Sequence, residues 1–202
     1  DARPEQLRRG LERCPGTREV EREPAPVARA FGGDLGDRGV DYRLRTLRHA
    51  ATYLVPPSME NEALLVRQYQ SLSGQKPAAD QIEINDRCIP AKAISAGVAW
   101  FEFRALCEGP RSAADYIEIA RDFHTLMLSG VPRFDAGNEE AARRFVYLVD
   151  SLYDRHVNLL LSAEADALSL YSGHRLKREF ERTSSRLIEM QSTEFLALEH
   201  RP

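Results

Sequence analysis

Cysteine is scarce in this sequence: only Cys14, Cys88 and Cys107 occur among 202 residues, and they lie far apart. An odd number of widely spaced cysteines does not match a disulfide framework, and it lacks the close pairs that bind zinc. We therefore expect free thiols, a reducing compartment and no metal site built on cysteine.

Neither sign of charge dominates, because 28 lysines and arginines face 31 aspartates and glutamates, for a net charge of -3. Proteins that bind a phosphate backbone usually carry a basic excess, so nucleic acid is not an expected partner. No run approaches the roughly 20 apolar residues that span a bilayer, so no membrane span is expected. The sequence begins Asp-Ala-Arg-Pro with no cationic and apolar leader, which we interpret as a fragment of a longer protein.

The sequence also lacks the parts of a complete P-loop enzyme. No GxxxxGK[ST] motif occurs, so there is no Gly-rich loop whose backbone N-H groups would cradle phosphates. The strand expected at Leu126 to Leu128 is followed by Ser129 and Gly130 instead of adjacent acids that would hold Mg²⁺. This chain therefore lacks both the phosphate-binding loop and the Mg²⁺-binding acids of such an ATPase.

What is present is an α/β pattern between Ala114 and Gln191. His124 to Leu128 form a short apolar run ended by Gly130 and Pro132, which is typical of a strand covered on both faces. An amphipathic helix follows, with Asn138 as its expected cap and a buried stripe at Phe145, Leu148, Val149 and Leu152. A second strand begins after Arg155, so the pattern predicts two parallel strands joined by one helix.

The earlier part of the chain divides into two regions. Residues 1–38 are rich in Pro, Gly, Arg and Glu, and we predict a poorly ordered segment there. Residues 39–202 form the expected α/β region, with a strand at Thr52 to Val55 and a helix at Asn61 to Leu72 capped by Ser58. Residues 80–104 read as two or three antiparallel strands, a small β-rich insert anchored by Trp100, Phe101 and Phe103.

Arginines are the candidate functional residues. Arg178, Arg182 and Arg186 are spaced four apart, so one helix face presents three guanidinium groups. An arginine directed at a neighbouring subunit's nucleotide can stabilise charge on the γ-phosphate, which makes Arg182 and Arg186 candidate catalytic arginines. Arg43 and Arg45, just after a predicted strand, are candidate nucleotide-binding residues. The alternative is a solvated, salt-bridged face, since glutamates share the helix.

Histidines offer weaker candidates. His124 follows Asp122, but no nucleophile is spaced to match, which favours a hydrogen-bonded structural histidine. His156 begins the second predicted strand, yet it has no carboxylate or cysteine partner at ligand spacing.

Several stretches together closely resemble the C-terminal part of the AFG-type AAA+ ATPases, a family that includes bacterial cell-division ATPases. The stretches are Gly39 to Leu47, Pro110 to Pro132, Glu140 to Glu164 and Phe180 to Leu196, with Pro4 to Leu11 resembling the segment after the family's nucleotide-sensing asparagine. The resemblance implies the C-terminal part of a P-loop NTPase-like domain. It also implies ATP and Mg²⁺ as cofactors of the intact protein, a location in the bacterial cytoplasm, a homo-oligomer, and association with the division-ring protein FtsZ.

Two departures from the family pattern affect these expectations. The family continues with another arginine and an apolar helix where this chain has Cys14, Pro15 and Gly16, so a candidate arginine finger is lost. The family often has an acid where this chain has Gly130. The alternative function is a non-catalytic interaction module in which the insert around Ile82 to Phe103 docks onto a division or quality-control partner.

Overall fold

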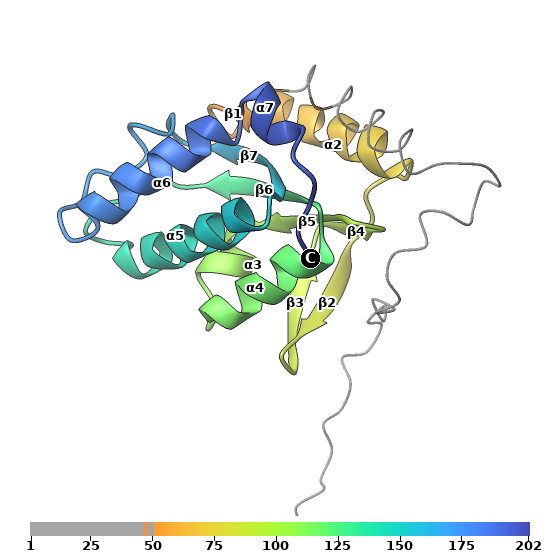
Figure 1. Ribbon diagram of the computed structural model, residues 1–202, viewed down its shortest axis with the longest axis horizontal. Coiled ribbons are helices and arrows are strands. Elements are labelled where there is room, and N and C mark those ends of the chain that lie inside the picture. Colours follow the sequence, from red (N-terminus) through yellow and green to blue (C-terminus); the bar gives the residue numbers. More distant parts are fainter. Residues whose placement is uncertain (1–46, 48–50) are drawn as a thin grey trace, which may run out of the picture.

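The computed structural model describes Leu47 and residues 51–202 (Figure 1). The expectations for the segment 1–38, for Arg43 and Arg45 and for Cys14 lie outside these residues.

The core of the molecule is a five-stranded sheet in the order β1-β7-β6-β5-β4. Its strands are β1 (Tyr53–Leu54), β4 (Ala93–Ser95), β5 (Val98–Glu102), β6 (Thr125–Val131) and β7 (Asn158–Ala163). β1, β7, β6 and β5 are parallel, and β4 pairs antiparallel with β5 at one edge. The α/β class is confirmed. A separate antiparallel hairpin consists of β2 (Asp80–Ile84) and β3 (Arg87–Ala91).

Helices cover both faces of this sheet. They are α2 (Met59–Ser73), α3 (Phe103–Cys107), α4 (Ala113–Asp122), α5 (Glu139–Asp154), α6 (Lys177–Glu189) and α7 (Thr193–Leu196). Figure 1 shows α2 on one side of the sheet and α4 and α5 on the other. Successive side chains of a strand point to opposite faces, so Met127 joins the core beneath α2 while Leu126 and Leu128 join the core beneath α5.

The predicted pair of parallel strands joined by one helix is confirmed by β6, α5 and β7. The cap of α5 differs from the prediction. Asn138 lies at the N-cap position, but its side chain makes no capping bond. Its Oδ1 instead accepts from the Asp135 N-H at 2.8 Å, and its Nδ2 donates to the Arg133 carbonyl at 3.0 Å. Asn138 therefore closes the β6–α5 turn instead of the helix end.

The insert is smaller than the sequence suggested. β5, which carries Trp100 and Phe101, belongs to the main sheet and lies parallel to β6, and Phe103 begins α3. Only β2 and β3 form a sheet of their own. Strand propensity predicts that a segment is extended, but it does not say which strand becomes its neighbour.

The tip of the β2–β3 hairpin is fastened to the N-terminus of α4. Asn85 and Asp86 have positive φ angles of 49° and 60°, as a tight hairpin turn requires. Asn85 Nδ2 donates to Asp115 Oδ1 at 2.8 Å, and Arg87 Nη1 donates to the Pro110 carbonyl at 2.8 Å. Asp115 also completes a capping box with Ser112 at the start of α4. The hairpin is thus part of the rigid unit.

One cysteine expectation is wrong and another holds. Cys88 on β3 is disulfide-bonded, because separation along the sequence does not limit which cysteines meet in a fold. Cys107 is a free, buried thiol, and burial raises its pKa far above the ordinary value. Cys107 is therefore a packing residue.

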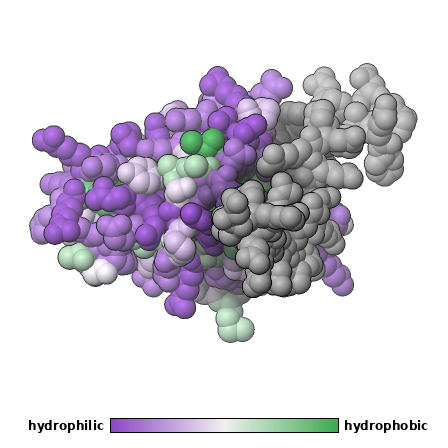
Figure 2. All heavy atoms as spheres, turned by 90° about the horizontal axis from the view of Figure 1, so that it is seen from below, coloured by the Kyte–Doolittle hydropathy of each residue, from purple (hydrophilic) through white to green (hydrophobic). Residues whose placement is uncertain are grey.

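Where Figure 2 shows the described residues, their surface is mostly hydrophilic, with small hydrophobic spots among the polar side chains. Among Leu47 and residues 51–202, no helix is long and apolar enough to cross a bilayer.

Candidate functional site at the carboxyl edge of the sheet

The carboxyl ends of the parallel strands mark the first place to look for a site. In open α/β sheets, ligands bind in the crevice outside these ends, where successive connections leave in opposite directions. Here β1 continues into α2 on one face of the sheet, while β6 continues into α5 on the other. Leu54 pairs with Ser162, and Glu102 pairs with Ser129, so these strand ends share one edge.

At this edge of the sheet, a lysine forms ion pairs with two carboxylates. Lys92, in the link between β3 and β4, forms ion pairs with Glu62 in the first turn of α2 and with Glu102 at the end of β5. The distance from Lys92 Nζ to Glu102 Oε1 is 2.6 Å. The ammonium also lies 4.7 Å from the centre of the Trp100 ring, a cation–π contact. One side chain therefore joins α2, β5 and the hairpin link.

A chain of hydrogen bonds extends this cluster across the sheet. Trp100 Nε1 donates to Ser129 Oγ at 2.8 Å, and Ser129 Oγ donates to Glu62 Oε1 at 3.3 Å. Next to Ser129, Gly130 has a φ of +74°, and its N-H donates to Ser162 Oγ at 3.0 Å. A Cβ at Gly130 would have only Glu102 Oε2 within 4 Å, at 3.8 Å, so there is open space beside the glycine.

The electrostatics of the cluster keep Lys92 charged. Burial alone would lower the pKa of Lys92, but hydrogen bonds and charge from Glu102 and Glu62 outweigh burial and raise it. A lysine held in this way does not act as a general base near neutral pH. Among the described residues, no group of three or more His, Cys, Asp or Glu side chains is arranged to hold a metal ion. The cluster therefore fixes α2 to the sheet.

Replacing Lys92 with methionine should lower the free energy of unfolding by about 1–2 kcal/mol, because two carboxylates then face each other without their cation. Urea unfolding followed by the fluorescence of Trp100, the single tryptophan, measures this directly. The exposed Lys76 gives the control, and Lys76→Met should change stability by less than about 0.5 kcal/mol. Equal effects of the two substitutions would contradict the assigned role of Lys92.

The connection between β1 and α2 is unsuited to phosphate. A phosphate loop presents glycine backbone N-H groups at a helix N-terminus, whereas residues 55–58 here are Val-Pro-Pro-Ser. Ser58 Oγ accepts the Asn61 N-H at 3.2 Å, and Glu60 and Glu62 occupy the first turn. On β1 itself, the Tyr53 hydroxyl donates to the Ala165 carbonyl, just after β7, at 2.8 Å. Acidic side chains and self-capping therefore disfavour an anion at this edge.

The predicted arginines lie elsewhere. Arg182 Nη2 is 2.7 Å from Asp150 Oδ2, and Arg186 Nη1 is 2.5 Å from Asp150 Oδ1, so both pair with α5. Arg186 also reaches Asp154 at 3.4 Å and covers the Tyr153 ring at 4.6 Å. These contacts lie on the face opposite α2, so the structure does not bring Arg182 or Arg186 to the Lys92 cluster. Arg43 and Arg45 are outside the described residues.

The two arginine side chains differ in exposure, so replacing each with alanine should lower the free energy of unfolding by different amounts. The Arg186 side chain is 21% exposed and the Arg182 side chain 54%. Arg186→Ala should lower the free energy of unfolding by about 1–2 kcal/mol through lost ion pairs and ring stacking, and Arg182→Ala by less than about 1 kcal/mol. Thermal unfolding of both variants tests this order. A larger loss for Arg182→Ala would refute it.

The histidines take structural positions. His124 Nδ1 lies 2.9 Å from Thr125 Oγ1 just before β6, and the His124 ring packs where a Cβ on Gly97 would be. His156, with a φ of +55°, lies 3.0 Å through Nδ1 from the Glu199 carbonyl oxygen. These contacts agree with the structural interpretation of both residues.

Sequence reasoning missed the residues of the carboxyl-edge cluster. Glu62 was visible only as a first-turn acid of α2, and Lys92 lies between alanines in a β-rich stretch. The sequence around Lys92 does not indicate its ion pairs, because its carboxylate partners, Glu62 and Glu102, lie far from it in the sequence.

Comparisons with known proteins identify the family. The model of the AFG1-like ATPase family matches residues 36–199. The chain is 44% identical over 165 residues to the cell division protein ZapE of Escherichia coli K12, which covers 81% of this chain and 44% of that protein. It is 34% identical over 134 residues to an uncharacterized protein of Schizosaccharomyces pombe, covering 65% of this chain and 30% of the relative. With lactation elevated protein 1 homolog B of Danio rerio, it shares 29% identity over 133 residues, 64% of this chain and 26% of the relative.

The similarity to these relatives covers only part of their length. The chain spans less than half the length of each of these relatives. No solved structure matches it significantly. Because the family model covers most of the chain, and because the fold is the parallel α/β sheet that the family resemblance implied, the chain belongs to the AFG1-like ATPase family.

Proposed function

We propose that this chain is the C-terminal part of a ZapE-like AAA+ ATPase, which binds and hydrolyses ATP with Mg²⁺ in the intact protein. The family match over residues 36–199 carries this proposal. The sequence has no phosphate-loop motif, and the β1–α2 connection, with its prolines and first-turn acids, does not suit a phosphate. The phosphate-binding loop and the Mg²⁺-binding acids accordingly belong to a part of the intact protein outside this chain, and the isolated chain does not bind ATP tightly.

The proposal extends to partners and location. The intact protein acts in the bacterial cytoplasm as a homo-oligomer and associates with FtsZ. Identity of 44% to a protein named for cell division supports a role in division. The balanced charge of the chain supports a protein partner over nucleic acid.

The four arginines have proposed roles in the intact enzyme. Arg43 and Arg45 contact the nucleotide, and Arg182 and Arg186 act as trans or sensor arginines. Arg182 is the better placed of the last two, because more than half of its side chain is exposed and it pairs with one carboxylate among residues 51–202. Arg186 is committed to two aspartates and a tyrosine ring.

Steady-state ATP hydrolysis by the intact protein tests these roles. Substitution of Arg43 or Arg182 with alanine should lower kcat by at least about tenfold, as loss of charge stabilisation at the γ-phosphate does. Arg121→Ala provides a control on the same chain, because Arg121 is exposed and, among the described residues, pairs with Glu118 alone. Unchanged turnover in both the Arg43 and the Arg182 variants would refute the assigned roles.

A second candidate function is a non-catalytic interaction module. The β2–β3 hairpin forms a two-stranded sheet of its own beside the main sheet, which favours this function. A titration of FtsZ with this chain in the absence of nucleotide separates the two. Saturable binding supports the module, and an ATP requirement supports the ATPase.

A further inference from the structure

The parallel part of the sheet has no gap that a strand from another part of the protein could fill. β1 pairs with β7, β7 with β6 and β6 with β5, so the four parallel strands are direct neighbours. The segments that leave their carboxyl ends also belong to this chain. They are residues 55–58, 132–138 and 164–176, while β5 passes directly into α3. Every position along this edge is therefore already taken.

An ATP site of the P-loop kind needs two such strand ends at once. The phosphate loop follows one strand, and the acids that hold Mg²⁺ end another strand of the same sheet. Here β1 leads into prolines, and β6 ends in Gly130 and Val131. The ion pairs of Lys92 with Glu62 and Glu102 tie α2 to β5 at the same edge. Residues supplied from outside this chain have no strand end here on which to build the site.

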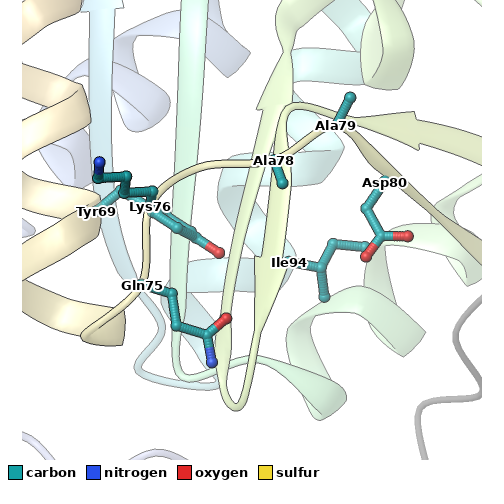
Figure 3. Close-up of a pocket in the computed structure, with 7 residues that line it drawn as sticks. All are labelled: Tyr69, Gln75, Lys76, Ala78, Ala79, Asp80 and Ile94. Atoms are coloured by element: carbon teal, nitrogen blue, oxygen red, sulfur yellow. The ribbon is translucent and has the colours of Figure 1, made fainter.

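The pocket in Figure 3 lies away from this edge. It has a volume of about 260 Å³, and Tyr69 and Gln75 line it at the C-terminal end of α2, with Ile94 from β4. Ile94 pairs with Ala99 near the start of β5, so the pocket lies toward the amino ends of the strands. It does not supply a nucleotide cleft at the carboxyl ends.

The outer edges of the sheet are short. β1 contributes two residues and β4 three. Pro56 and Pro57 follow β1 closely, and a proline has no N-H to donate to a further strand. A phosphate loop and Mg²⁺-binding acids need several added strands, and edges of two or three residues are a poor foundation for them.

Both faces of the sheet already have a core. Met127 and Leu160 are buried on one face together with Leu65 of α2, and Leu126 and Leu161 are buried on the other face in the cluster that contains Phe145 of α5. A sheet with helices packed on both faces is the usual make-up of an independent domain. We propose that this sheet and its helices are a folding unit of their own, and that the intact protein binds ATP on a second sheet. The inference rests on the proposed function, because it concerns where the ATP of that function binds.

Differential scanning calorimetry of the intact protein, with and without Mg·ATP, and of this chain alone tests the inference. Two transitions are expected in the intact protein. Mg·ATP should raise only one of them, because a ligand stabilises the unit that binds it. The other should coincide with the transition of the chain alone. A single transition, or two transitions that both rise with Mg·ATP, would overturn the inference.

Failure of the proposed function gives a different result. In that case Mg·ATP raises neither transition. One transition that matches the chain alone would still support the separate folding unit, and the absence of such a match would refute it.

Substitution of the buried Phe134 assigns the transitions. Phe134→Ala should lower the ATP-insensitive transition by about 8–16 °C, in the intact protein as in the chain alone, and should leave the other in place. Phe134→Leu removes less of the ring and should lower the same transition by less, which keeps the test if the alanine variant does not fold. Leu168→Ala, at a side chain that is 75% exposed, should move neither transition. Phe134 variants that lower both transitions equally would contradict the inference.

Discussion

Replacing Phe134 with alanine is expected to lower the free energy of unfolding by about 4 kcal/mol, the usual cost of a large cavity in a packed core. Phe134 is fully buried just after β6. Its ring centre lies 5.4–5.6 Å from those of Phe103, Phe145 and Phe180, which come from α3, α5 and α6. Its backbone N-H also donates to the Leu170 carbonyl at 2.8 Å. One ring therefore holds three helices against the sheet.

Urea denaturation monitored by circular dichroism measures this loss. Leu168→Ala is the matched control, because Leu168 is a large apolar residue that is 75% exposed. It should change stability by less than about 0.5 kcal/mol. A Phe134→Ala variant as stable as Leu168→Ala would show that the aromatic cluster does not carry the core.

The second large effect is expected at Asp115, where alanine should remove about 3 kcal/mol at neutral pH. The Asp115 side chain is almost fully buried and accepts hydrogen bonds from Asn85 Nδ2 and the Ser112 N-H, both at 2.8 Å. Arg87 Nη1 lies 3.4 Å from its second oxygen. Alanine would leave these donors without their acceptor and would free the hairpin from α4.

The same residue predicts how stability depends on pH. Burial alone would raise the pKa of Asp115, but hydrogen bonds from Asn85 and Ser112 and the charge of Arg87 hold it below its ordinary value of 3.8. A carboxyl with a depressed pKa stabilises the fold fully above the unfolded-state pKa and loses this contribution as the pH falls through the folded-state pKa. The difference in stability between the parent chain and Asp115→Ala should therefore be constant from pH 7 to about pH 5 and shrink below about pH 4.

Equilibrium unfolding of both proteins across this pH range provides the test. Glu118→Ala serves as a control on the same helix, because within the described part of the chain Glu118 forms an ion pair with the exposed Arg121 alone. A difference that stays constant to pH 2 would contradict the role of the Asp115 charge.

The centre of the fold was predictable from sequence because its patterns are local. The run at 124–128, the stripe of α5 and the run after Arg155 each specify their own element, and parallel pairing follows from one helix between two strands. Ser58 was likewise expected to cap α2, and its side chain does so in the structure by accepting the Asn61 N-H. Such signals lie within a few residues of the feature they specify.

What could not be predicted depends on distant residues. The sequence pattern predicts a separate small sheet for Trp100. In the structure its strand, β5, pairs in parallel with β6, and the paired residues Val98 and Thr125 lie 27 positions apart in the sequence. The helix face that carries Arg178, Arg182 and Arg186 ends at Glu189, and Ser192 caps a separate helix, α7, by accepting the Phe195 N-H at 3.1 Å. Lys92 acquires its role only when α2 and β5 meet beside it.

The proposal that ATP is held outside this chain can be tested by calorimetric titration of Mg·ATP into the chain and into the intact protein. The account predicts no saturable heat with the chain, because the β1–α2 connection presents prolines and acids where a phosphate loop presents glycine N-H groups. It predicts saturable binding and hydrolysis with the intact protein. Tight binding of Mg·ATP to the chain alone, or an intact protein that neither binds nor hydrolyses ATP, would contradict it.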